Sequence, residues 1–92
     1  MGRILHNYTR TEESRGTVLN KIRVIIDTQS DVREFVNIAS TIEEEVFLED
    51  GTHFRADAKS LMGVMYGKVE FKELYVLSDN DMIASKFSKF IV

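Results

Sequence analysis

The chain has 92 residues, a formal net charge of −3 at pH 7 and 29% charged residues. This length predicts a single domain, and the small acidic excess gives no basic field for nucleic acid or an anionic membrane. The sequence has no cysteine, which excludes disulfides, a thiolate nucleophile and a Cys-type zinc site. Its histidines, His6 and His53, lie far apart, so no metal site and no cofactor are expected.

No stretch is apolar over the length of a membrane span, and the start lacks the apolar core of a signal peptide. We therefore expect a cytoplasmic protein with no membrane partner and no nucleic-acid partner. Residues 1–17 are polar and aperiodic, which predicts a flexible N-terminal tail without structure. Residues 18–92 are predicted to form the domain.

The first predicted strand begins at Val18 and continues through Ile22, Val24 and Ile26 with a period of two. A helix is predicted next, because a hydroxyl and a carboxylate three residues apart have the spacing of a capping box. Apolar residues then recur at i, i+3, i+4 and i+7, which predicts one buried helix face. The capping pair is Thr28 and Asp31, and the stripe comprises Val32, Phe35, Val36 and Ala39.

Asp50-Gly51 separates two short alternating runs and predicts a β-hairpin with a type I′ turn, which needs positive φ at both central residues. The strand before the turn contains Val46 and Leu48. The strand after it covers residues 52–56, with Phe54 pointing inward and His53 outward.

A second helix is predicted over residues 59–66, with Ser60 as its N-cap and Gly67 at a left-handed C-terminal end. The apolar residues that follow Ser60 are too many to be hidden on one face of two helical turns. Leucine, methionine and valine are usually buried, which favours packing of these residues in the core. The alternative is an exposed surface that docks a protein partner, formed by Lys59, Leu61, Met62 and Met65 beside Ser60.

A fourth strand is predicted over residues 74–77, and polar residues 78–81 are expected to cap a last helix. Its apolar stripe comprises Ile83, Phe87, Phe90 and Ile91. The resulting order, β-α-β-β-α-β-α, predicts an α+β fold. A four-stranded antiparallel sheet would carry three helices on one face and leave the other face in water.

Residues 48–65 read Leu-Glu-Asp-Gly-Thr-His-Phe-Arg-Ala-Asp-Ala-Lys-Ser-Leu-Met-Gly-Val-Met. With the element order, they resemble HPr, the histidine-containing phosphocarrier of the bacterial sugar phosphotransferase system. Family members carry Lys-Ser-Ile/Leu-Met-Gly-Val/Leu-Met after a glycine turn, and residues 59–65 match at every position. The resemblance covers about residues 18–92 and implies an open-faced β-sandwich. It also implies that Ser60 stands at the serine that some bacteria phosphorylate as a regulatory mark.

The chain departs from the family at the phosphohistidine motif, Gly-x-His-Ala-Arg-Pro, which opens the first helix of family members. Counting back from residues 38–40 puts the family histidine on Thr28, the arginine on Ser30 and the proline on Asp31. A threonine hydroxyl cannot accept and return a phosphoryl group near neutral pH as an imidazole does. Asp27 and Asp31 would also repel an incoming phosphate. The sequence therefore predicts no phosphohistidine relay and no catalytic residue.

The expected function is a regulatory, protein-binding module related to the sugar phosphotransferase system, and not an enzyme. A catabolite-repression relative within the family lacks the histidine, keeps the serine and acts only as the partner of a transcription factor. It keeps the neighbouring arginine, which this chain lacks. Partners would be phosphotransferase-system or transcription-regulatory proteins, and the chain would be a monomer or a homodimer. Two alternatives stay open, namely a phosphocarrier with an unconventional acceptor such as Thr28 or His53, and an interaction domain with no phosphorylation.

Overall fold

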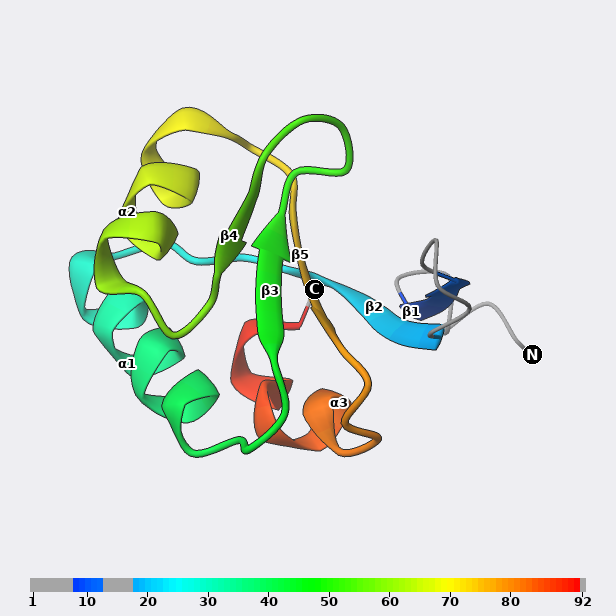
Figure 1. The fold of residues 1–92 in the computed structure, drawn as a ribbon. Coiled ribbons are helices and arrows are strands. Elements are labelled where there is room, and N and C mark those ends of the chain that lie inside the picture. The colour runs from blue at the N-terminus through cyan, green and yellow to red at the C-terminus, as the bar shows by residue number, and fades with distance from the viewer. Residues whose placement is uncertain (1–7, 13–17, 92) are drawn as a thin grey trace.

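A computed structural model describes residues 8–12 and 18–91. These residues form a five-stranded antiparallel sheet in the order β1-β2-β5-β3-β4, with α1, α2 and α3 packed on one face (Figure 1). The strands are β1 (Tyr8–Glu12), β2 (Val18–Val24), β3 (Val46–Glu49), β4 (Arg55–Asp57) and β5 (Leu74–Ser78). The helices are α1 (Gln29–Ser40), α2 (Leu61–Glu70) and α3 (Ile83–Lys86), followed by the 3₁₀ turn η2 (Ser88–Phe90).

The predicted α+β architecture is confirmed. The four predicted strands are β2, β3, β4 and β5, and they form a continuous antiparallel sheet. Val76 of β5 lies in the middle of this sheet, opposite Ile22 of β2 and Leu48 of β3. All three side chains are buried beneath the helices, because residues directly opposite one another on neighbouring strands point to the same face of the sheet.

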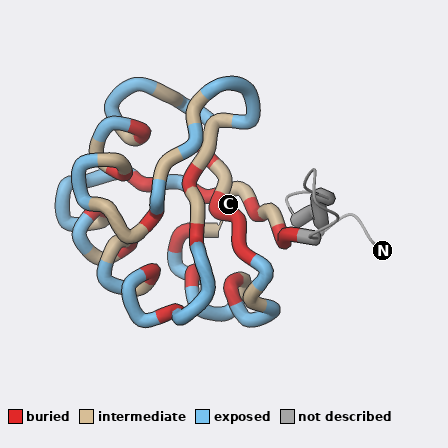
Figure 2. Tube along the Cα trace, in the orientation of Figure 1, coloured by how far each residue is buried: buried red, intermediate tan, exposed pale blue. Residues whose placement is uncertain are grey.

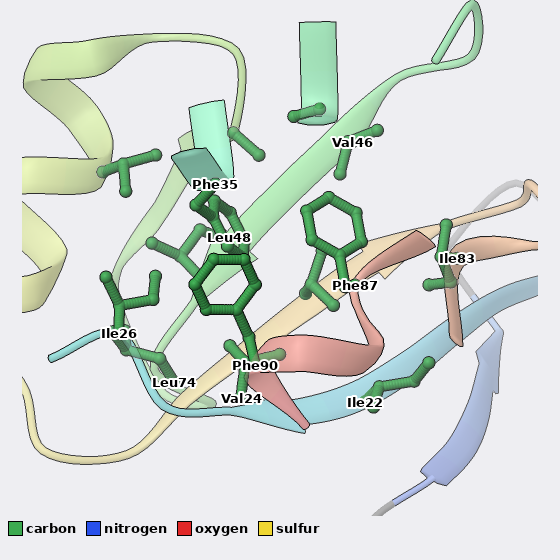
Figure 3. Packing of buried hydrophobic residues seen from close by; sticks show 14 of the residues in the cluster. Ile22, Val24, Ile26, Phe35, Val46, Leu48, Leu74, Ile83, Phe87 and Phe90 are labelled. Atoms are coloured by element: carbon green, nitrogen blue, oxygen red, sulfur yellow. The ribbon is translucent and has the colours of Figure 1, made fainter. Parts of the chain in front are cut away.

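Phenylalanine side chains close the core between α1 and the C-terminal segment (Figure 3). The ring of Phe35 lies 4.7 Å from the ring of Phe87 and 5.5 Å from the ring of Phe90, measured between centroids. The predicted stripe of α1 is therefore confirmed, with Val32, Phe35 and Ala39 fully buried. The capping box is confirmed as well, with Thr28 as the N-cap of α1.

The opposite face of the sheet is polar, as predicted, but its own long side chains cover it. Leu77 points to this face and is fully buried, opposite Lys21 on one neighbouring strand and Phe47 on the other. The carboxylate of Glu49 lies 3.5 Å from Lys21 and 2.8 Å from Arg55. The same two cations lie over aromatic rings of this face, Lys21 over Tyr75 at 4.6 Å and Arg55 over Phe47 at 5.0 Å from the ring centroids.

Residues 8–12, which the sequence assigned to an unstructured tail, form β1. This strand pairs with β2 from Tyr8 opposite Ile22 to Glu12 opposite Val18. A segment without apolar periodicity can still add to a sheet, because the ladder of hydrogen bonds uses only backbone groups. The other residues of the predicted tail lie outside the described part of the chain, and the boundary at residue 17 stays a prediction.

The predicted two-residue type I′ turn is wrong. Asp50 to Phe54 form a five-residue loop between β3 and β4, and Gly51 alone among the described residues has positive φ (93°). The Asp50 carboxylate accepts hydrogen bonds from the backbone N–H groups of Thr52, His53 and Phe54 at 2.9 to 3.1 Å. The side chain therefore takes the place of the backbone hydrogen bonds of a tight turn.

The last predicted helix is shorter than expected and divides into α3 and η2. Its N-cap is Met82, which makes no side-chain capping hydrogen bond. The Asn80 side chain caps the start of this segment instead. Its Oδ1 accepts a hydrogen bond from the Met82 N–H at 2.7 Å, and its amide nitrogen donates to the Glu44 carboxylate at 2.8 Å. The predicted stripe is nevertheless buried at Ile83, Phe87 and Phe90.

Candidate functional site

Ser60 is the N-cap of α2, as the sequence predicted. Its Oγ accepts a hydrogen bond from the Gly63 N–H at 3.2 Å, and its own N–H donates to the Asp57 carbonyl at 2.9 Å. The Asp57 carboxylate also accepts from the Lys59 N–H at 2.9 Å. The end of β4 thus fixes both the position of Ser60 and the direction in which α2 leaves the sheet.

Gly67 lies inside α2, so the prediction that it ends the helix in a left-handed conformation is wrong. The helix continues to Glu70 because Gly67 lets it pack closely on the Asp50–Phe54 loop. A Cβ atom at residue 67 would come within 2.8 Å of the Phe54 ring, and one at residue 63 within 3.0 Å of the Ala56 Cβ. The inner side of α2 therefore touches β4 and the loop before it.

The other side of α2 is exposed and apolar. We call it the α2 outer face and define it as Leu61, Met62, Tyr66 and Val69. Their exposed fractions are 49%, 83%, 55% and 66%, respectively. Figure 2 shows exposed positions alternating with half-buried and buried ones along α2. Such a group of exposed apolar side chains along one helix is typical of a protein-docking surface.

The sequence identified only part of this surface. Of the residues proposed for docking, Leu61 and Met62 are exposed, Lys59 is partly exposed, and Met65 packs against the core. Val69 was missed because the helix was expected to end at residue 66, and Tyr66, the last residue of the predicted helix, was not singled out. Their spacing from Met62, i+4 and i+7, was the signal that could have found them.

An aromatic cluster supports the C-terminal half of the α2 outer face. The Tyr66 ring lies 5.6 Å from the ring of Phe54 and 6.2 Å from the ring of Phe71. The rings of Phe54 and Phe71 stack on each other at 5.0 Å. One side of Tyr66 is therefore held by neighbouring rings while more than half of its surface remains accessible.

Thr28, the predicted position of the family histidine, is the N-cap of α1. Its Oγ1 accepts from the Asp31 N–H at 3.0 Å. In return, the Asp31 carboxylate accepts from the N–H groups of Asp27 (3.1 Å) and Thr28 (3.2 Å). The hydrogen bond from the Thr28 backbone contributes most to lowering the pKa of Asp31. The negative charge of this carboxylate thus lies at the start of the helix, where it would repel a second anion.

The remaining candidates form no second site. His53 is exposed in the loop before β4, and His6 lies outside the described residues. No group of three or more metal-ligating side chains occurs among residues 8–12 and 18–91. Within the same part of the chain, no helix is long and apolar enough to cross a membrane.

No family model and no curated protein matches this chain. Among solved structures, it is similar to the crystal structure of HPr-C-His from Thermoanaerobacter tengcongensis, with a TM-score of 0.50 and 22% sequence identity. The similarity covers 74% of this chain and 94% of that one. The fold is HPr-like. The open-faced β-sandwich that the resemblance implied is therefore confirmed, while the family roles of Thr28 and Ser60 stay predictions.

Proposed function

We propose that this chain is an HPr-like, protein-binding regulatory module of a bacterial sugar phosphotransferase system, cytoplasmic and without phosphohistidine relay chemistry. It would be no enzyme and would need no cofactor. Its partner would be a protein of that system or a transcription regulator controlled by it, bound through the α2 outer face. Ser60 would be the site at which phosphorylation controls this binding.

The observation that carries the proposal is the position of Ser60 directly before the α2 outer face. The next two residues after the cap, Leu61 and Met62, are among the most exposed apolar side chains described. A protein kinase would transfer the γ-phosphoryl group of ATP to the Ser60 Oγ, which loses its proton, and release ADP. The helix N-terminus favours the added negative charge, so the fold would tolerate it while the docking surface changes.

The arrangement at the start of α1 supports the absence of a relay. Thr28 offers a hydroxyl in place of an imidazole, and the Asp31 carboxylate, held by the N–H groups of Asp27 and Thr28, would repel a phosphate at the start of α1. Ser30 stands where the family places a cation. A phosphocarrier that used Thr28 would first have to break its own capping box.

One alternative keeps a specific observation in its favour, namely an interaction domain without phosphorylation. The Ser60 hydroxyl has a structural role as the helix cap, and this role alone would account for a serine at that position. The two functions differ in whether modification of Ser60 changes partner binding, whereas both need the α2 outer face.

Binding measurements with purified proteins test the proposal. The first enzyme of the phosphotransferase system and its catabolite-control transcription factor, both from the same bacterium, would be titrated against wild type, Met62→Asp, Ser60→Asp and Met82→Asp. Met82 is exposed and lies at α3, which makes it the matched control. We expect Met62→Asp to abolish binding, Ser60→Asp to change it and Met82→Asp to leave it unchanged. Equal binding by wild type and Met62→Asp would contradict docking through α2.

A further inference from the structure

The two ends of the chain pair with the same edge of β2. We call residues 88–91 the C-terminal segment. Its last residue, Ile91, forms an isolated antiparallel bridge with Val24, and the Phe90 carbonyl accepts a hydrogen bond from the Ile25 N–H at 2.8 Å beside this bridge. Because β5 pairs with β2 as far as Val24 on one edge, the bridge lies on the other edge, which β1 occupies further along. The C-terminal segment therefore continues the edge that β1 covers.

The register of β1 directs the residues before it to the place that Ile91 holds. Tyr8 pairs with Ile22, so two further residues of the same ladder would bring His6 opposite Val24. Ile91 already pairs there. Each side of a strand has room for one neighbouring strand, at a spacing of about 4.8 Å. A lengthened β1 and the C-terminal segment therefore exclude each other at Val24.

The two residues that follow β2 keep the alternation of a strand. Ile25 is 53% exposed and Ile26 is 7% exposed, so their side chains point to opposite faces of the sheet. A lengthened β1 would bring Leu5 opposite Ile25 and Ile4 opposite Ile26. Residues directly opposite each other share a face, so Leu5 would lie over the exposed Ile25. The sequence before β1 is thus apolar at the two positions where it would meet an apolar neighbour.

Core contacts keep the C-terminal segment in place. The buried ring of Phe90 lies 5.5 Å from the ring of Phe35, and Ile91 packs against the same core. On the surface, the Lys89 Nζ lies 2.6 Å from the carboxylate of Glu34 in α1. Burial of a phenylalanine ring contributes more to stability than one further backbone hydrogen bond. The arrangement with the C-terminal segment on β2 is therefore the more stable one.

We propose that residues 4–7 are a competing occupant of this edge and pair with β2 whenever the C-terminal segment leaves it. The Ile25 N–H, which donates to the Phe90 carbonyl in the structure, would then donate to the Leu5 carbonyl by the same antiparallel geometry. The exchange would free the C-terminal segment and uncover the ring of Phe35 while β2 keeps a partner. It goes beyond the proposed function, since neither α2 nor its N-cap takes part.

Amide hydrogen exchange of Ile25, followed by NMR, tests the competition. Ile91→Asp should release the C-terminal segment, because a carboxylate is costly against the core. Exchange of the Ile25 amide should nevertheless rise no more than about threefold, since the Leu5 carbonyl becomes its acceptor. Leu5→Pro removes the N–H that would complete the new pair, so the double variant should exchange about tenfold faster than Ile91→Asp or more. Leu5→Pro alone should match wild type, because the Phe90 carbonyl still protects the amide.

A nuclear Overhauser contact between the α-protons of His6 and Val24 should appear in Ile91→Asp and be absent from wild type. Val69→Asp, at an exposed apolar position of α2, is the control and should change neither measurement. Should Ile91→Asp not fold by circular dichroism, Ile91→Gly removes the same core contacts without adding a charge and allows the same comparison. Equal Ile25 exchange with and without Leu5→Pro in the residue 91 variant would overturn the proposal, whether the amide is protected in both chains or in neither.

Discussion

Side chains accept hydrogen bonds from backbone N–H groups at several places, among them Thr28 and Asp31 at α1, Asp50 in the loop before β4, and Ser60 at α2. The pair at α1 and the serine at α2 were predictable, because a cap depends on residues only three positions apart. The role of Asp50 was not predictable from the Asp-Gly pair. Its carboxylate reaches N–H groups two to four residues onward, and this arrangement competes with the tight turn that the same pair favours.

Ser60→Ala should lower the free energy of unfolding by about 1 kcal/mol, because the Gly63 N–H loses its capping acceptor. Ser60→Asp should keep the melting temperature within a few degrees of wild type, since aspartate also caps. Urea unfolding followed by circular dichroism measures both, with Ser85→Ala at an exposed position as the control. A Ser60→Ala variant as stable as wild type would show that the cap contributes nothing.

The lowered pKa of Asp50 predicts that the stability of the fold depends on pH. Hydrogen bonds from the Thr52 hydroxyl and the Thr52 N–H lower the pKa of Asp50 from 3.8 to about 2, so the folded state favours the charged form. The stabilisation is therefore complete above about pH 5 and disappears as the pH falls from about 4 to 2, where the folded state takes up the proton.

The melting temperature of Asp50→Ala should accordingly lie below that of wild type at neutral pH, and the gap should close as the pH approaches about 2. Asp79→Ala, at an exposed bend, is the matched control and should show no such gap. Thermal unfolding monitored at several pH values measures this. A gap between Asp50→Ala and wild type that stays constant with pH would contradict the account of the loop.

At the scale of elements, α2 was predictable at its start but not at its end. The cap and the apolar residues after it located the helix, whereas Gly67 suggested a stop. The glycine at residue 67 is explained by a tertiary contact and not by a helix end. Phe54, from the loop before β4, leaves no room for a Cβ at this position. The same error concealed Val69, one of the four residues of the α2 outer face. Local sequence could not show which of two glycine roles applies here.

Gly67→Ala should destabilise the protein by about 1–3 kcal/mol, even though alanine favours helix formation, because the new Cβ would lie 2.8 Å from a ring that stacks on Phe71. Lys68→Ala, one residue along the same helix, should be nearly neutral. Chemical denaturation of the two variants provides the measurement. A stabilised Gly67→Ala would mean that Phe54 moves aside at little cost.

For the whole molecule, the layers were predictable because strand alternation and helix stripes identify which face of each element is buried. The fifth strand was not, since residues 8–12 have no apolar periodicity and yet pair with β2. The core cluster includes residues from Ile22 to Phe90. The domain of residues 18–92 is therefore expected to fold without the segment before it.

Removal of residues 1–17 should lower the melting temperature by no more than a few degrees, equivalent to about 1 kcal/mol or less. β2 would lose its pairing with β1 and become an edge strand of the sheet. Thermal unfolding and amide exchange of the truncated chain would measure this, with β2 expected to lose protection first. A truncated chain that does not fold would show that the N-terminal segment belongs to the domain.

The central claim is that this HPr-like fold works by protein docking and not by carrying a phosphoryl group. Its most direct test is incubation with phosphoenolpyruvate and the first enzyme of the phosphotransferase system, followed by mass spectrometry at neutral pH and after acid treatment. An authentic HPr in a parallel reaction shows that the enzyme is active. We predict no acid-labile phosphate on this chain, because Thr28 caps α1 and no imidazole lies between Asp27 and Val32. A phosphohistidine at His53 or His6, or a phosphoryl group on Thr28 that passes onward, would contradict the account.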